Sequence, residues 1–403
     1  MKTNSKSPKS RFLTGAALAM AFTFLAGGQS HAQCTEIVSG LHGPTGITQS
    51  NKGNLLVAEA GPVTPNSGRI SIVTTEGERR TLVDGLPSGV YFETNGASGP
   101  NGVFLRGRTL YVTIGVGNSV VAGPGPGLIA PNPTPASPLF SSVLAIHFSA
   151  HVEATTAGFT LTAAQQHALA AGETVTLWNG QGDRMTIDLV VNFRNYIPDP
   201  RPNFAGNVRQ SNPFDLLALG NHLYVTDGGQ NSVKEVDLAR GTSSVLVTFA
   251  PIPNPLFPNV GGPVVEAVPT GIAYADGKLL VTLFRGFPFV PGLSVVAQVD
   301  PTTGQHAPLI RGLTDAIDVL PITRNSSRND QDARYLVLQF ASAPFLSPPG
   351  LLLEFDSATS APRLLANCLI APTSMTLDDR TGKVYIAELT GQIIAVQVKG
   401  GNH

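Results

Sequence analysis

Acidic side chains recur at two equivalent positions of a repeated pattern in this chain. One position is the third residue, counted from a proline, of a short motif that opens each repeat, and the other ends an apolar segment about a dozen residues later. Converging carboxylates suit Ca²⁺, because this hard cation takes about six to eight oxygen ligands. With one asparagine beside a motif, the predicted metal ligands are Glu59, Asn101, Asp215, Asp227, Asp318 and Glu388.

The same pattern also has a structural interpretation. Acidic residues at fixed repeat positions often accept hydrogen bonds from backbone amides in neighbouring turns. A metal site requires three or more of these carboxylates to converge within about 5 Å of one point. The structural role instead requires each carboxylate to bond an amide in its own repeat. The two hypotheses therefore make different geometric predictions.

Two further segments have residue types suited to a site. His42 lies beside the first motif, where it would act as a general base or form a hydrogen-bonded turn. The segment LFRGFPFVPG at 283–292 carries Phe284, Phe287 and Phe289 around Arg285. These residues would form an aromatic rim for an apolar ligand, or a plug that packs the loop onto its neighbour.

Six copies of one unit must position these residues. The opening motif reads GPTGIT at 43–48, GPNGVF at 99–104, NPFDLL at 212–217, VPTGIA at 268–273, TDAIDV at 314–319 and APTSMT at 371–376. Alternating apolar segments follow each motif and predict half-buried strands. Outer fourth strands are visible in several units, for example RRTLVDGL at 79–86. Four-stranded units in a closed radial array predict an all-β, six-bladed β-propeller.

The sixth unit lacks an outer strand of its own. CTEIVSGL at 34–41 matches the outer-strand pattern, so we expect the mature N-terminal strand to close the last blade. Cys34 begins this strand, and Cys368 lies near the end of the preceding blade's outer strand. A disulfide needs Cα atoms within about 7 Å, so the pattern leaves both a bridge and two free thiols open.

The second blade carries the irregular segments. Residues 150–211 are predicted to be an insertion with one helix, LTAAQQHALAAG at 161–172, and one further strand, ETVTLWNG at 173–180. Such an insertion is either a lid or protein-partner surface, or a flap that only covers the fold.

The N-terminal segment predicts export. Basic residues precede an apolar run at 12–28, and small residues stand at Ser30 and Ala32. This is a signal-peptide pattern, so we expect residues 1–32 to be cleaved and residues 33–403 to be the propeller, secreted or periplasmic. No later apolar stretch is long enough to span a membrane. Only 13% of residues are charged and the net charge is −1, which argues against nucleic acid as a partner.

The repeats resemble the ScyD/ScyE family of exported, NHL-like propeller proteins. The resemblance is most specific at 211–237, at 268–292 and in LTDAIDV at 313–319. It implies a propeller fold and export, and it carries no assigned reaction. The family usually has an acidic residue where Leu283 stands here. The chain is more distantly similar to regucalcin and gluconolactonase propellers, whose channel metal would correspond to ligands at Glu59, Asn101 and Asp227.

The sequence thus leaves three functional hypotheses. In the first, the channel face binds a small molecule, peptide or glycan. In the second, the chain is a Ca²⁺-dependent hydrolase, lactonase or lyase with Glu59, Asp227 and Asp318 as ligands and His42 as base. In the third, it is a structural scaffold.

Overall fold

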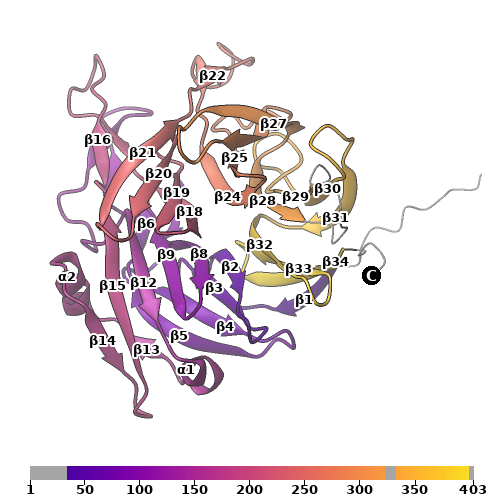
Figure 1. Cartoon of the computed structure of the whole chain (residues 1–403). Helices are drawn as coiled ribbons and strands as arrows, with labels where there is room; N and C mark the ends of the chain where they lie inside the picture. Colours follow the sequence, from indigo (N-terminus) through magenta and orange to yellow (C-terminus); the bar gives the residue numbers. More distant parts are fainter. Residues whose placement is uncertain (1–33, 323–332, 399–403) are drawn as a thin grey trace, which may run out of the picture. The chain divides into compact units, whose positions relative to one another are not determined.

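Each repeat forms an inner strand that begins near its motif, followed outward by further antiparallel strands. The computed structural model describes residues 34–322 and 333–398. Within these residues six sheets of four or five strands are arranged as a β-propeller (Figure 1). The predicted fold class is therefore confirmed. The predicted signal peptide, residues 1–32, lies outside the described residues.

Three blades have the plain four-stranded form, with strands in chain order from the centre outward. Blade 3 consists of β18 (Pro213–Leu219), β19 (His222–Asp227), β20 (Ser232–Asp237) and β21 (Thr242–Thr248). Blade 4 consists of β24 (Pro269–Ala275), β25 (Lys278–Leu283), β26 (Ser294–Val299) and β27 (His306–Leu313). Blade 5 consists of β28 (Ala316–Ile322), β29 (Arg334–Gln339), β30 (Gly350–Phe355) and β31 (Arg363–Leu369). Proline is tolerated at the first residue of a strand, which explains its place in the motif.

Blades 1 and 2 each gain a fifth strand. Blade 1 consists of β2 (Pro44–Gln49), β3 (Leu55–Glu59), β4 (Gly68–Val73) and β5 (Arg79–Leu86), with β13 (Phe159–Thr160) parallel to β5. Blade 2 consists of β8 (Pro100–Arg106), β9 (Thr109–Ile114), β12 (Ser142–His147), β15 (Arg184–Asn192) and β14 (Val175–Trp178) at its edge. Part of the predicted insertion 150–211 is therefore blade 2's own fourth strand, β15.

Another part of this insertion joins blades 1 and 2. It contains α1 (Ala150–Thr155) and α2 (Ala163–Ala170), and α2 together with β14 confirms the predicted helix and strand. Thr162 caps α2 in a capping box. From α1, the buried Glu153 accepts hydrogen bonds from Ser50 and Asn54 of blade 1 and from Arg108 of blade 2. The segment therefore clamps two neighbouring blades together.

Short hairpins decorate the end of the propeller at which the inner strands begin, which we call the channel face. They lie in connections that lead into inner strands or join second to third strands. The hairpin strands are β6 (Gly89–Tyr91) with β7 (Gly96–Ser98), β10 (Val120–Ala122) with β11 (Ile129–Pro131), β16 (Tyr196–Pro198) with β17 (Val208–Gln210), and β22 (Ile252–Pro253) with β23 (Val264–Val265).

Strands from distant parts of the chain close the ring. Blade 6 consists of β32 (Pro372–Asp378), β33 (Lys383–Glu388) and β34 (Gln392–Gln397), with β1 (Cys34–Val38) outermost (Figure 1). Cys34 of β1 lies opposite Val396 and Val38 lies opposite Ile393, so the predicted closure is confirmed. A disulfide joins Cys34 to Cys368 of blade 5, with Cα atoms 6.6 Å apart. The bridge that the sequence left open is therefore formed.

The core fills the spaces between adjacent blades. Successive residues of a strand point to opposite faces, and both faces of each blade are covered by neighbours. In β25, Leu279 and Val281 pack in the cluster shared with blade 3, whereas Leu280 packs in the cluster shared with blade 5. This explains why the second strands read as nearly continuous apolar runs. Among the described residues, no helix has the length and apolar character needed to cross a membrane.

Candidate functional site

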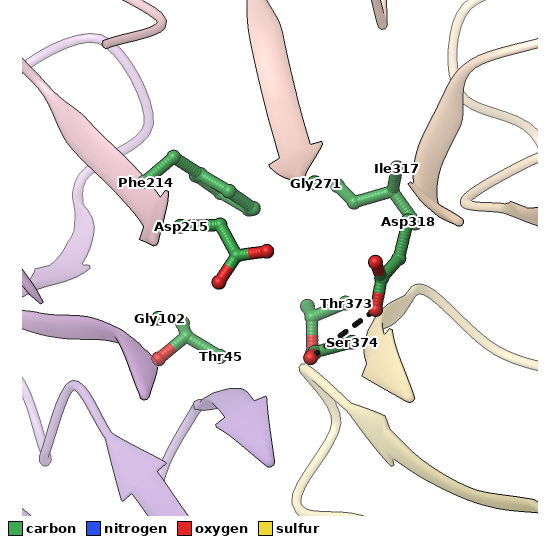
Figure 2. A pocket seen from close by; sticks show the side chains of 9 residues that line it. All are labelled: Thr45, Gly102, Phe214, Asp215, Gly271, Ile317, Asp318, Thr373 and Ser374. Carbon is green, nitrogen blue, oxygen red and sulfur yellow. Dashed lines mark hydrogen bonds between the residues drawn. The ribbon is translucent and has the colours of Figure 1, made fainter. Parts of the chain in front are cut away.

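The third motif residues of blades 2 to 6 meet at the centre of the propeller. They line a narrow cavity together with their neighbours, and Figure 2 shows its walls: Thr45, Gly102, Phe214, Asp215, Gly271, Ile317, Asp318, Thr373 and Ser374. Asp215 comes from β18 and Asp318 from β28. The cavity leaves no room for a water-sized sphere. It therefore brings two predicted residues together without space for a substrate.

Both carboxylates connect their own blade to the next one. One oxygen of each accepts a hydrogen bond from the amide of the following residue, at 2.8 Å for Asp215 and 2.7 Å for Asp318. The second oxygen of Asp215 accepts from the amide of Ile272 in blade 4, at 3.1 Å. The second oxygen of Asp318 accepts from the amide of Met375 in blade 6, at 2.8 Å, and from the Ser374 hydroxyl, at 3.4 Å. These bonds hold the inner strands in register around the centre.

Glycine at the same motif position of the preceding blade makes room for each aspartate. A Cβ atom on Gly102 would lie 2.5 Å from the Asp215 Cα, and one on Gly271 would lie 2.7 Å from the Asp318 Cα. Real Cβ atoms do not approach backbone so closely. The alternation of Gly and Asp in the motifs therefore follows from packing at the centre.

The enclosed environment changes the acidity of this pair. Burial raises the pKa of Asp215 to about 7, although its two backbone hydrogen bonds act in the opposite direction. Burial, and then the charge of Asp215, raise the pKa of Asp318 well above its ordinary value. The two groups titrate as a pair, and both bind protons more tightly than an exposed aspartate does.

The acidic residues that end the second strands have a different role. Glu59 is fully buried and accepts hydrogen bonds from the backbone amide of His42, at 2.6 Å, and from the Ser71 hydroxyl. The Arg79 guanidinium donates to both of its oxygens, at 3.0 and 2.9 Å. Both oxygens of Glu59 therefore have hydrogen-bond partners within blade 1.

The equivalent residues of other blades repeat this arrangement. Asp227 accepts from the amide of Asn212 at 2.8 Å and pairs with Lys234 at 2.6 Å. Glu388 accepts from the amide of Ile370 at 2.7 Å. Burial raises the pKa of Glu388, with the bond from Ile370 lowering it in part. Each carboxylate thus fixes the turn that leads into its own blade's inner strand.

Blade 5 shows that this role needs no charge. At the same position Gln339 accepts a hydrogen bond from the amide of Thr314 through its side-chain oxygen, at 2.9 Å. The structural interpretation of this repeat position is therefore the one that the contacts support.

The contacts of the predicted metal ligands can be described one by one. Glu59, Asp227 and Glu388 point into turns of their own blades and do not line the central cavity. Asn101 donates its side-chain amide to the Pro213 carbonyl at 2.8 Å. Across residues 34–322 and 333–398, no three His, Cys, Asp or Glu side chains are grouped so that they could hold a metal ion. The structure therefore does not bring the six predicted ligands together around one point.

His42 lies outside the central cavity as well. Its side chain is exposed, its amide donates to Glu59 and its carbonyl accepts from the Gly61 amide at 3.0 Å. The base and ligand arrangement proposed for a hydrolase is therefore not assembled around it.

The phenylalanine loop has a buried half and an exposed half. Phe284 is only 9% exposed, and its ring contacts those of Phe289 and Phe340 at centroid distances of 6.1 and 5.9 Å. Phe287 is 53% exposed, and its ring lies 6.3 Å from that of the exposed Phe345. The inner half of the loop is a plug and its outer half is an exposed aromatic rim.

Arg285 belongs to the buried half of this loop. It is 7% exposed, its Nε donates to the Leu293 carbonyl at 3.2 Å, and one terminal nitrogen has no hydrogen-bond partner. Burial lowers the pKa of Arg285. The guanidinium supports the loop from within and does not form part of its exposed rim.

A polar cavity on the channel face was not predicted. Its volume is about 190 Å³, and its walls come from the β10–β11 and β16–β17 hairpins and from turns of blades 3 and 4: Gly127, Ile129, Asp199, Arg201, Asn207, Val208, Arg209, Gln210, Gly229 and Glu266. These residues lie outside the repeated strands, so the repeat pattern gave no signal for them. The only sequence feature that points to the cavity is the clustering of Arg, Asn and Asp residues between 199 and 210.

Two ion pairs fix the polar groups of this cavity. Arg209 binds both oxygens of Glu266, at 2.9 and 3.3 Å, and Arg201 pairs with Asp199 at 2.7 Å. Burial acts to raise the pKa of Glu266, but its bonds and charge interaction with Arg209 outweigh burial and lower it. Gln210 donates to the Tyr91 hydroxyl, whereas its own side-chain oxygen has no partner. The cavity therefore offers guanidinium donors and carboxylate acceptors that are held in place, whereas the Gln210 side-chain oxygen is buried.

Comparison with known proteins supports the fold. No family model matches the chain, and no curated protein matches it. Among solved structures, the PQQ-bound aldose sugar dehydrogenase of Streptomyces coelicolor aligns over 91% of this chain and 99% of its own, with 14% identity and a TM-score of 0.50. A gluconolactonase from Xanthomonas campestris aligns over 91% of this chain and 90% of its own, with 10% identity and a TM-score of 0.47.

A third similar structure is virginiamycin B lyase from Staphylococcus aureus. It aligns over 91% of this chain and 99% of its own, with 13% identity and a TM-score of 0.44. At 14% identity, the similarity to the sugar dehydrogenase shows a shared fold and leaves the activity open. The class that fold and comparison define is the six-bladed β-propeller.

Proposed function

We propose that this chain is a binding propeller that captures a small, hydroxyl-rich molecule, such as one sugar unit of a glycan, in the polar cavity of its channel face. The observation that carries the proposal is the pair of Arg–carboxylate contacts facing a cavity of about 190 Å³. The central cavity is too narrow to serve the same purpose.

The chemistry of the cavity favours a neutral polyol. Each arginine is already paired with a carboxylate, so the site offers no unpaired charge of either sign to a ligand ion. Sugar hydroxyls both donate and accept hydrogen bonds, so they match the guanidinium donors and the carboxylate acceptors at once. A cavity of this size suits one ring and leaves the remainder of a longer ligand on the channel face.

Ca²⁺-dependent hydrolysis does not enter this proposal, because the residues that would hold the ion are used inside their own blades. Export does enter it. The signal-peptide pattern of residues 1–32 and the disulfide between Cys34 and Cys368 both suit an oxidising compartment. Kinship with the ScyD/ScyE family rests on the motifs alone. Cell fractionation with N-terminal sequencing tests export, and mature protein beginning at Gln33 is the expected result.

The experiment for the binding site is a ligand-observed NMR screen of the mature protein against neutral hexoses, hexuronic acids, amino sugars and short peptides, followed by titration calorimetry. We expect neutral sugars to bind. Glu266→Gln and Arg209→Met should each weaken that binding at least about tenfold, because each leaves a charged partner without its hydrogen bonds.

The matched control is Arg240→Gln. It removes the ion pair between Arg240 and Asp237, which lies in the turn between β20 and β21, away from the cavity. It should leave binding unchanged. Equal loss in the control and the cavity variants, or binding of no sugar in the screen, would overturn the proposal and favour the scaffold hypothesis.

The aromatic rim supports a second candidate, an apolar ligand or partner segment at Phe287 and Phe345. Their exposed rings lie side by side on the channel face. A solvatochromic apolar dye should bind the natural chain, and Phe287→Ser with Phe345→Ser should abolish that binding. Unchanged dye binding in the double variant would exclude the rim.

A further inference from the structure

Three adjacent strands of blade 2 hold a hydroxyl, an imidazole and a carboxylate in one row. The row lies at the end of the blade away from the channel face. The Thr109 hydroxyl lies 2.9 Å from His147 Nδ1, and His147 Nε2 lies 3.0 Å from an oxygen of Asp188. The three residues come from β9, β12 and β15, which are adjacent in the sheet. In the register of β9 and β12, Thr109 lies directly opposite His147.

In the neutral tautomer that satisfies both hydrogen bonds, His147 carries its proton on Nε2. An ionised Asp188 can only accept, so it fixes the ring proton on Nε2. Nδ1 is then an acceptor, and the Thr109 hydroxyl donates to it. The other oxygen of Asp188 accepts from the Thr174 hydroxyl, which holds the carboxylate in place. A hydroxyl, a base and a group that orients the base are the parts of a nucleophilic site.

This row opens onto the largest of the three cavities described, a groove of about 600 Å³. Thr109 and His147 line the groove, and the buried Phe148 and Met185 contribute an apolar floor. Arg184 also lines it, and its exposed guanidinium has no ion-pair partner in the part of the chain that the structure describes. The groove thus combines an apolar surface with one free positive charge beside the row.

We propose that this groove is a second functional site, at which Thr109 is the nucleophile of an esterase acting on small carboxylic esters. The Thr109 oxygen forms a bond to the ester carbonyl carbon while His147 Nδ1 takes the hydroxyl proton. The bond from that carbon to the alcohol oxygen then breaks, and the alcohol leaves with the proton from His147. Water repeats the sequence on the acylated Thr109 and releases the acid.

Each of the remaining groups has one task in this reaction. Asp188 stabilises the positive charge that His147 gains when it accepts the proton. Arg184 faces the negative charge that develops on the carbonyl oxygen. Phe148 and Met185 contact the acyl chain. No metal or cofactor is needed, since the reaction only exchanges an ester bond for water.

The test measures hydrolysis of p-nitrophenyl acetate and butyrate by the mature protein, together with intact-mass detection of an acylated chain. Thr109→Ala, His147→Ala and Asp188→Asn should each lower kcat/KM at least about a hundredfold. Thr109→Ser should retain activity. Peptide mapping of protein treated with a fluorophosphonate probe should place the label on Thr109.

Blade 3 supplies the matched control. His222 of β19 faces Glu235 of the adjacent strand β20 at 2.9 Å, so it is a second surface His–carboxylate pair that has no hydroxyl bonded to the ring. His222→Ala should leave hydrolysis unchanged. Full activity in Thr109→Ala with loss only in His147→Ala would show an imidazole acting alone, and this would overturn the proposal. Hydrolysis by the natural chain no faster than by Thr109→Ala would overturn it too.

Discussion

Replacing Asp215 by asparagine tests the physical description of the propeller centre. The folded chain holds the Asp215 proton because burial raises its pKa to about 7, compared with about 3.9 in an unfolded chain. A group whose pKa is raised on folding contributes stability that is complete below the unfolded pKa and is lost as the pH rises through the folded pKa. The relevant window therefore runs from about pH 4 to about pH 8.

The size of the effect follows from these two values. At about 1.4 kcal/mol per pH unit, their separation corresponds to about 4 kcal/mol of unfolding free energy. Asparagine does not titrate, so the variant loses this dependence. Its amide nitrogen cannot accept one of the two backbone bonds that Asp215 receives, which costs about 1–3 kcal/mol at every pH. Removing the Asp215 charge also lowers the pKa of Asp318, which acts in the same direction.

Urea unfolding at several values between pH 4 and pH 8 separates the two contributions. Relative to the natural chain, Asp215→Asn should be less stable at pH 4 and should gain about 4 kcal/mol by pH 8. Thr45→Val is the control, since it removes a 2.7 Å bond to the Pro100 carbonyl at the same centre without removing a titratable group. A stability difference between Asp215→Asn and the natural chain that stays constant with pH would refute the reasoning.

Three further predictions concern the blades. Replacing both Cys34 and Cys368 by serine should lower the unfolding free energy by about 5 kcal/mol, measured by urea titration, because the bridge closes nearly the whole ring; an unchanged midpoint would contradict this. Phe284→Ala should lower the unfolding free energy by about 3–5 kcal/mol, whereas Phe287→Ala should change it by less than about 0.5 kcal/mol. Similar melting temperatures for the two variants would disprove the division of the loop into a buried and an exposed half. Glu59→Ala should lower the unfolding free energy by about 3 kcal/mol, because it leaves buried hydrogen-bond donors unpaired. EDTA should not shift the melting temperature of the natural chain, and a large shift would restore the metal hypothesis.

The sequence was sufficient to predict the blades because their pattern is local. A motif, a strand of apolar residues and a turn recur at nearly constant spacing, and the closing strand at 34–41 matches the outer strands of other blades. The strand β15 was missed because about 36 residues separate it from β12, which breaks the spacing. Its alternating sequence, RMTIDLVVN, has the pattern of the other outer strands.

The candidate site was harder to predict because repeat position does not determine side-chain direction. Asp215 and Asp318 reach the centre, whereas Glu59 and Glu388 turn into their own blades, and Gln339 shows that the second position serves a backbone amide. The polar cavity and the Thr109 row depend on contacts between residues far apart in the chain. Only the folded structure brings these residues together.

The composite sixth blade sets the order in which the ring can be completed. Three of its strands come from one end of the described chain and the fourth from the other end, so the edge of β34 has no neighbour until both ends are present. An open strand edge can pair with a strand of another chain. Truncation of β1 would therefore expose the edge of β34 and promote aggregation through it.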